Sequence, residues 1–368
     1  MYKYGLMTPL EKYQLDLGRE DFHSEDAQRE TAMKLNQLHA DFSKVQNQTG
    51  ILSKLFPKRH KLKGLYLWGT TGRGKTYLMD SFYECVTAEK KYRTHFHRYM
   101  RDIHGQLASL KHVPDPLDVL GNQLAAEYQL LCLDEFQIYD IGDAMILGGL
   151  LKALFDNGVT LVTTSNTPIK QLYKNGLQRD RFLFAIDLLQ GHTEEVYLGD
   201  GVDYRALMLE KNGIYSISED GNEGFLENYL AAIAPCRPKR NRKLEINDRI
   251  VHYKALADDV IWFDFYELCK THRSAHDYIE VAQVYNTVLI SNVAVMNEDN
   301  DDVAKRFIDL VDTLYDYKVK LVLTAQKEPE ELYQGRNYAF AFERTVSRLH
   351  EMRSKEYLCA MRASSLPA

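Results

Sequence analysis

The chain has 368 residues, which is enough for two packed units or for one large α/β domain with a smaller appendage. Hydrophobic residues make up 45% and charged residues 27% of the sequence, and these values exclude a globally disordered chain. The formal net charge of −6 excludes a globally basic nucleic-acid-binding protein, although a local basic groove stays compatible with it.

Nothing in the sequence indicates a membrane span or a targeting segment. We find no run of about eighteen apolar residues, as a membrane-spanning helix requires. The first six residues contain neither an apolar signal core nor the arginine-rich pattern of a transit peptide. Five scattered cysteines without the close spacing of a zinc site are typical of a reducing compartment. We therefore expect a cytoplasmic protein.

The first 63 residues predict an N-terminal helical region. Thr8, Pro9 and Glu11 supply a capping residue, a proline at the first helical position and an acid in the first turn. A second helix is predicted from near Ser24 to Val45, because its apolar residues recur at helical spacing.

After this region, strands and helices alternate along the chain. The predicted strands cover residues 64–68, 94–97, 130–133 and 159–164. Strands that alternate with helices of this length predict βαβ units, and therefore a parallel sheet flanked by helices. We assign residues 64–234 to this α/β core.

A linker is predicted near residues 235–243, where two prolines and five cations give no core-forming pattern. Residues 244–368 then predict a C-terminal α/β region with a lid helix. Within it, a strand–helix–strand series resembles the one that contains residues 131–173, with Ser291 and Asn292 in the place of two acids. A true internal repeat and a chance likeness of two βαβ pieces both fit this pattern.

The strongest functional signal is the segment 69–76, which matches the phosphate-binding P-loop pattern in full. Its glycines let the backbone wind around phosphate oxygens, and the helix that follows adds its positive N-terminal end. Lys75 can reach the β- and γ-phosphates of ATP, and the hydroxyl of Thr76 can bind Mg²⁺. The predicted nucleotide-binding residues are Gly69, Thr70, Thr71, Gly72, Arg73, Gly74, Lys75 and Thr76.

Two acids follow the apolar strand at 130–133, as in the Walker B arrangement. Asp134 is predicted to hold Mg²⁺, and Glu135 to orient and deprotonate the attacking water. Asn166 ends the next strand, where its amide can position the same water. The alternative for Asn166 is a turn-forming residue shortly before Pro168.

Hydrolysis of ATP often needs a further cation to offset the charge of the transferring phosphoryl group. Arg181, with Arg179 as second choice, is the candidate for such a finger, supplied to a neighbouring subunit. Surface ion pairs are the alternative for both arginines. Near the end of the chain, Arg348 or Arg344 lies in an amphipathic helical segment and is a candidate to reach the nucleotide from a lid.

Taken together, these motifs resemble the AFG-like AAA+ ATPases. The segments that carry the resemblance are 64–80, 95–100, 133–136, 175–183 and 347–352. The likeness extends along nearly the whole chain, with Phe184 in a place where the family usually has proline. It implies an α/β fold of the AAA+ P-loop type, with N-terminal helices and a C-terminal α/β region that resembles a lid.

The resemblance also implies an ATP hydrolase that uses Mg²⁺ and works as a homo-oligomer. In bacteria it implies association with FtsZ or another division-ring protein during constriction, with any approach to the membrane made through such partners. Mitochondrial relatives are tied to protein quality control, which is one alternative function. A nucleic-acid-linked AAA+ loader is a second alternative, although nucleic acid is not the expected partner.

Overall fold

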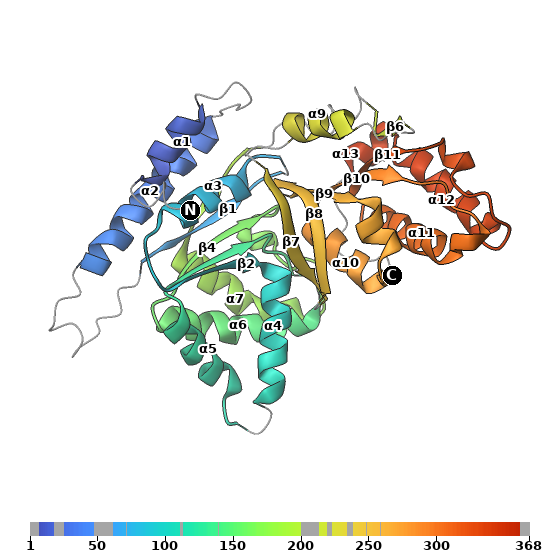
Figure 1. Cartoon of the computed structure of the whole chain (residues 1–368). Coiled ribbons are helices and arrows are strands. Elements are labelled where there is room, and N and C mark those ends of the chain that lie inside the picture. Colours follow the sequence, from blue (N-terminus) through green and yellow to red (C-terminus); the bar gives the residue numbers. More distant parts are fainter. Residues whose placement is uncertain are drawn as a thin grey trace. The chain divides into compact units, whose positions relative to one another are not determined.

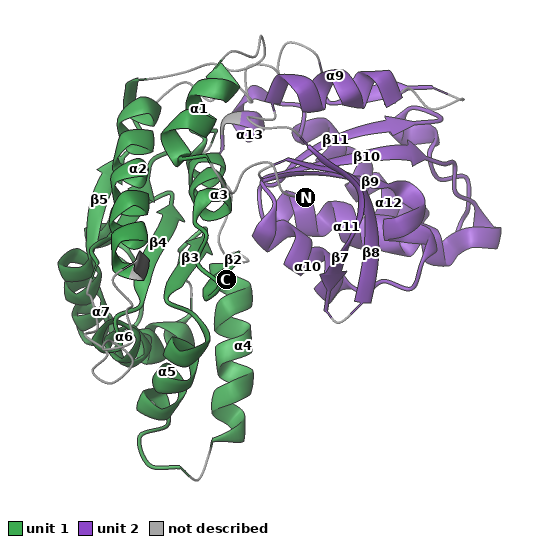
Figure 2. Ribbon diagram, turned by 60° about the vertical axis from the view of Figure 1, so that its left-hand side comes forward, with its two compact units in different colours: residues 1–201 green, residues 202–368 purple. Residues whose placement is uncertain are grey.

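The computed structural model describes residues 7–17, 26–47, 62–70, 72–110, 113–138, 140–199, 213–218, 223–233, 238–247, 249–257 and 259–360. The chain divides into two compact units, residues 1–201 and 202–368 (Figure 2). Each unit has its own sheet and its own hydrophobic core, and each is described by itself.

The first unit is built on a five-stranded parallel sheet with the strand order β2-β3-β4-β1-β5 (Figure 1). Its strands are β1 (Gly64–Trp68), β2 (Lys91–His95), β3 (Leu130–Asp134), β4 (Thr160–Ser165) and β5 (Thr193–Tyr197). Gly64 allows the close approach of β1 to β4, because an added Cβ would lie 1.8 Å from the carbonyl oxygen of Leu161. Since the strands are parallel, their carboxyl ends meet at one edge of the sheet.

Helices cover both faces of this sheet, so that its strands are buried on either side. The helices of the unit are α1 (Pro9–Leu17), α2 (Asp26–Asn47), α3 (Lys75–Cys85), α4 (Phe96–Ser109), α5 (Pro116–Glu127), α6 (Ile141–Asp156) and α7 (Arg179–His192). Helices α4 to α7 pack on the face that presents Tyr66, Leu131 and Leu161. Helix α3 lies on the opposite face and carries α1 and α2 on its outer side (Figure 2). The predicted P-loop type of α/β fold is confirmed.

The N-terminal helices are part of the first unit. The hydroxyl of Tyr77 on α3 donates a hydrogen bond of 2.6 Å to Asp16, near the C-terminal end of α1. Lys12 forms an ion pair with Glu84 at the other end of α3. Within the predicted region 1–63, the described helices α1 and α2 therefore pack against the core through the helix that follows the P-loop.

The second unit has a six-stranded sheet with the order β6-β11-β10-β9-β8-β7. Its strands are β6 (Tyr215–Ile217), β7 (Lys239–Ile246), β8 (Arg249–Ala257), β9 (Val260–Asp264), β10 (Thr287–Val293) and β11 (Lys320–Ala325). Its helices are α9 (Glu223–Ile233), α10 (Ala275–Val284), α11 (Asp301–Asp316), α12 (Ala339–Glu351) and α13 (Lys355–Cys359), with a π-helical turn η3 (Tyr266–Lys270) and 3₁₀ turns η4 (Glu298–Asn300) and η5 (Pro329–Glu331).

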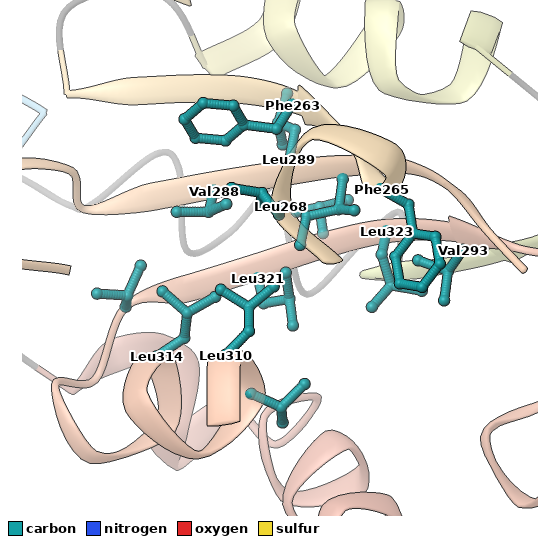
Figure 3. Close-up of a cluster of buried hydrophobic side chains, with 14 of the residues drawn as sticks. Phe263, Phe265, Leu268, Val288, Leu289, Val293, Leu310, Leu314, Leu321 and Leu323 are labelled. Carbon is teal, nitrogen blue, oxygen red and sulfur yellow. The ribbon is translucent and has the colours of Figure 1, made fainter. Parts of the chain in front are cut away.

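An extended apolar core holds the second unit together. Leu310 and Leu314 lie four residues apart on one face of α11, where they pack against Leu321 of β11 (Figure 3). Phe265 belongs to the same core and meets Phe307 edge-on, with ring centroids 5.8 Å apart. The second unit thus has its own core, and it begins before residue 244, where the predicted C-terminal α/β region starts.

Two boundaries differ from the prediction. The predicted linker 235–243 is wrong from residue 239 onward, because β7 pairs there with β8 as an antiparallel edge strand. The lysines and arginines of β7 are exposed, and charged side chains on an edge strand hinder pairing with other chains. The first part of the predicted linker, residues 235–237, lies outside the described ranges. In addition, β6 and α9, which the prediction placed in the core 64–234, belong to the second unit, since β6 pairs with β11.

The second unit repeats the plan of the first. Its strands β6, β11, β10 and β9 lie parallel and adjacent in the same order as β1, β4, β3 and β2. The connections also agree, because α9 follows β6 as α3 follows β1, and α11 joins β10 to β11 as α6 joins β3 to β4. The hairpin of β7 and β8 is the addition that distinguishes the second copy.

Individual hydrogen bonds recur in both copies. Tyr66 donates its hydroxyl to the carbonyl oxygen of Thr167 at 2.8 Å, and Tyr215 donates in the same way to Lys327 at 2.5 Å. The register also agrees, because Asp264 stands beside Ser291 as His95 stands beside Asp134. The predicted likeness of the two strand–helix–strand series is confirmed, with serine and asparagine in the places of the two acids of the first copy.

Candidate active site

The P-loop lies at the carboxyl edge of the first sheet. It leaves β1 after Trp68 and enters α3 at Lys75, as the motif requires. Gly69, Gly72 and Gly74 have φ angles of 150°, 78° and 70°, which glycine adopts far more easily than other residues. The structure thus brings the predicted residues 69–76 into one loop at the start of α3, with Thr71 outside the described residues.

The positively charged side chain of Lys75 lies inside this loop. The ammonium of Lys75 donates hydrogen bonds to the carbonyl oxygens of Gly69 at 2.9 Å and Thr70 at 2.7 Å. Lys75 is buried despite its charge, with 8% of its surface exposed. The loop therefore holds a positive charge beside the N-terminus of α3, and both features favour a polyphosphate.

The two predicted magnesium-binding residues lie next to each other. The hydroxyl of Thr76, at the start of α3, donates a hydrogen bond of 3.0 Å to Oδ1 of Asp134, at the end of β3. Asp134 is 1% exposed, and the hydroxyl of Thr164 on β4 also donates to its Oδ1. Three elements distant in the sequence thus converge on one carboxylate.

Arg93 on β2 is the charged partner of this carboxylate. Its guanidinium lies 3.1 Å from Oδ2 of Asp134, and it forms a second ion pair with Asp80 on α3. Burial by itself would raise the pKa of Asp134, but Arg93 and His95 together with the two hydroxyl donors hold it below its ordinary value. Asp134 is therefore ionised at neutral pH, as a metal-binding carboxylate must be.

Sequence reasoning missed Arg93 and Asp80, although a signal for Asp80 existed. Asp80 follows Thr76 by four residues, so that both side chains lie on one face of α3, where Thr76 meets Asp134 of β3 and Asp80 meets Arg93 of β2. Arg93 shares a face of β2 with His95, which stands beside Asp134 in the sheet. That pairing depends on the order of the strands, which the motifs alone do not specify.

The backbone turns sharply at Glu135. Its φ angle of 51° lies in the left-handed region, and its N–H donates to the hydroxyl of Thr164 at 2.9 Å and to Oδ1 of Asp134 at 3.2 Å. The next residue, Phe136, donates its N–H to the carbonyl oxygen of Thr164 at 2.7 Å. This corner is therefore anchored to β4, and it places the half-buried Glu135 beyond the end of β3.

Asn166 follows directly after β4, at the same edge of the sheet as Glu135. It is half-buried, and within the described ranges its side chain has no hydrogen-bond partner. Its neighbour Ser165 donates a hydrogen bond of 2.9 Å to the carbonyl oxygen of Phe136, which ties the two strand ends together. An amide without a protein partner at this position fits the predicted contact with a water or a phosphate.

The two candidate finger arginines have different surroundings. Arg179, the first residue of α7, donates a hydrogen bond of 2.8 Å to the carbonyl oxygen of Lys170 in its own chain. Arg181 is exposed and has no ion pair with any residue that the structure describes. Of the two, Arg181 is therefore the more exposed, as the predicted finger requires, and that role stays a prediction.

The C-terminal arginines lie on α12 of the second unit. Arg348 forms ion pairs with Asp312 at 2.6 Å and Asp316 at 3.3 Å, and its guanidinium lies 4.7 Å from the ring centroid of Tyr315. Arg344 also pairs with Asp312. These carboxylates neutralise both arginines within their own unit, so the contacts give no support to the predicted role at the nucleotide, which stays a prediction.

Gln28 of α2 contacts the P-loop, and the sequence alone did not indicate this contact. Its Nε2 donates a hydrogen bond of 3.2 Å to the carbonyl oxygen of Arg73. Arg73 is itself buried and directs its Nε to the carbonyl oxygen of Gly199 at 3.5 Å. Both bonds join the loop to segments far away in the sequence, and no local motif marks them.

The oxygen atoms that this site offers as metal ligands suit a magnesium ion that also binds phosphate. Mg²⁺ uses one or two protein oxygens together with water and substrate phosphates, and Thr76 and Asp134 offer a hydroxyl and a carboxylate. Across the described ranges, no group of three or more His, Cys, Asp or Glu side chains is arranged to hold a metal without such help. Nor is any helix in the described part of the chain long and apolar enough to cross a membrane.

Comparisons with known proteins agree with this geometry. The family model described as AFG1-like ATPase matches residues 7–361. Cell division protein ZapE of Escherichia coli (strain K12) is 39% identical over 365 residues, which cover 96% of this chain and 97% of that protein. Lactation elevated protein 1 homolog B of Danio rerio is 35% identical over 347 residues, 82% of this chain and 69% of that protein. The chain belongs to the AFG1-like ATPase family.

Proposed function

We propose that this protein hydrolyses ATP in a Mg²⁺-dependent reaction and uses the energy to act on a division-ring protein such as FtsZ. The observation that carries the catalytic part is the contact between Thr76 and Asp134, which joins the P-loop helix to the acid-bearing strand. Thr76 and Asp134 would hold Mg²⁺, which when bound would supply positive charge that offsets the charge developing on the transferring phosphoryl group.

Each of four residues has its own role in the proposed hydrolysis of ATP. Lys75 leaves the carbonyl oxygens of its own loop and pairs with the terminal phosphates of ATP. Glu135 takes the proton of the attacking water, and Asn166 orients that water. Arg181 supplies a positive charge to the site of a neighbouring copy, which makes a homo-oligomer the working form.

The partner is proposed from likeness to the relatives. The relative called cell division protein ZapE is aligned over 97% of its own length at 39% identity. We propose the same kind of work for this chain, in the cytoplasm and with any approach to the membrane made through its partners. No described feature of the site favours nucleic acid as the substrate.

The test is the rate of ATP hydrolysis against protein concentration, with and without FtsZ filaments. We expect a rate per chain that rises with concentration, because each site needs a neighbour, and that rises further with filaments. Lys75→Ala should abolish nucleotide binding and turnover, and Glu135→Gln should keep ATP bound without hydrolysis. Normal turnover by Lys75→Ala would contradict the catalytic proposal, and stimulation by DNA instead of filaments would contradict the choice of partner.

A further inference from the structure

The side chain of Gln28 is buried at the outer side of the P-loop. Only 9% of its surface is exposed, and its Nε2 donates to the carbonyl oxygen of Arg73. Gly74 allows this approach, because a Cβ added there would lie 3.2 Å from the same Nε2. The carboxamide therefore touches the loop at the two residues that immediately precede Lys75.

The other end of this carboxamide is unpaired. Oε1 of Gln28 is buried and accepts no hydrogen bond from any residue that the structure describes. A buried acceptor without a donor is unfavourable, so such atoms in native proteins usually have a ligand or a water as partner. The guanidinium of Arg73, whose carbonyl oxygen accepts from Gln28, instead directs its Nε to the carbonyl oxygen of Gly199.

We propose that Gln28 recognises the base of the bound nucleotide, with its Oε1 accepting a hydrogen bond from the 6-amino group of adenine. The inference rests on the proposed ATP site. In a P-loop the backbone N–H groups surround the phosphates, so the nucleoside would extend beyond the loop, and Gln28 contacts this loop from its outer side. A carboxamide matches adenine well, because its oxygen pairs with the 6-amino group.

This contact would select ATP over GTP. Guanine carries an oxygen at position 6, so that two acceptors would face each other across the contact and Oε1 would stay unpaired. Discrimination of this kind is strong where a buried polar group of the site loses its partner. The competing explanation is that Gln28 only ties α2 to the loop through its bond to Arg73, in which case the base is irrelevant to it.

The experiment is a binding cycle that deletes each half of the contact in turn. Calorimetry measures the dissociation constants of the β,γ-imido forms of ATP, GTP and purine riboside triphosphate, which lacks the 6-amino group. The variants are Gln28→Met, which keeps the length of the side chain and removes both polar atoms, and Gln28→Glu, which keeps an acceptor and removes the donor to Arg73. Gln37→Met is the control, because Gln37 is an exposed glutamine farther along the same helix.

We expect deletion of the 6-amino group to weaken binding to the wild type about tenfold, as loss of one buried hydrogen bond does. The same deletion should cost Gln28→Met nothing, while Gln28→Glu and Gln37→Met should keep most of the discrimination. A tenfold loss that persists in Gln28→Met would overturn the inference, as would a wild type that binds all three nucleotides equally. Failure of the wild type to bind any of them would overturn the proposed function as well.

Discussion

Replacement of Arg93 tests how the acidic corner of the site is stabilised. Arg93→Met keeps most of the side-chain volume and removes the cation between Asp80 and Asp134. Since Asp134 is 1% exposed, its charge has no access to water in the variant. Removing one partner of a buried ion pair costs about 3–5 kcal/mol, so the free energy of unfolding of the first unit should fall by about that amount.

The loss should depend on pH in a defined direction. In the wild type the pKa of Asp134 lies below its ordinary value, so the ionised carboxylate stabilises the folded state. This contribution to the free energy of unfolding is complete above the ordinary pKa, and it is lost as the pH falls through the lowered pKa of the folded state. Without Arg93, burial dominates and the pKa of Asp134 rises above its ordinary value. In the variant, Asp134 is then protonated at a higher pH in the folded state than in the unfolded state, which stabilises the folded state as the pH falls. The difference in the free energy of unfolding between variant and wild type should therefore shrink as the pH falls from 8 toward 4.

The assay is urea unfolding at several pH values in the presence of EDTA, which keeps metal ions out of the comparison. Arg93→Met with Asp134→Asn should recover much of the lost stability, because asparagine removes the uncompensated charge and still accepts from the hydroxyl donors. Arg240→Met is the control, since its ion pair with Glu227 is exposed and should contribute less than about 1 kcal/mol. A variant as stable as the wild type at pH 8, or a loss independent of pH, would refute the reasoning.

Two further predictions use the repeat and the subunit interface. Thr164→Val and Thr324→Val each remove the hydroxyl that accepts a backbone N–H, so each should destabilise its unit by about 1–3 kcal/mol. Only Thr164→Val should lower ATP turnover, and an equal loss in both would contradict our assignment of the active copy. Arg181→Ala should bind ATP without hydrolysing it, and mixing it with Glu135→Gln should restore part of the activity. A mixture that stays inactive at every ratio would count against a finger supplied by a neighbour.

Residues that act within one short segment could be predicted from the sequence. The P-loop is a continuous motif, and the two acids follow one apolar strand, so local spacing was enough to identify them. Arg93, Gln28 and Thr164 could not be found in this way. Their partners lie 41, 45 and 30 positions away, and only the strand order and the packing of α2 bring them together.

The wrong prediction at β7 has a related cause. An edge strand has only one neighbouring strand, and the first five of the eight residues of β7 are all exposed. The sequence of β7 therefore lacks the alternation of apolar and polar residues by which a strand is predicted. Asn241, with a φ angle of 48°, also interrupts the ladder with β8. The cationic run therefore had the composition of a linker and the structure of a protected sheet edge.

The left-handed backbone at Glu135 would ordinarily be explained as strain stored for catalysis. Asn292 adopts the same conformation, with a φ angle of 64°, and its N–H also donates to a threonine hydroxyl on the next strand. No acid stands at that position in the second copy, so hydrolysis cannot be what maintains its geometry. The bend is a property of the scaffold that both copies share, and Glu135, the glutamate proposed to activate the water, occupies a corner that the chain forms whether or not chemistry takes place there.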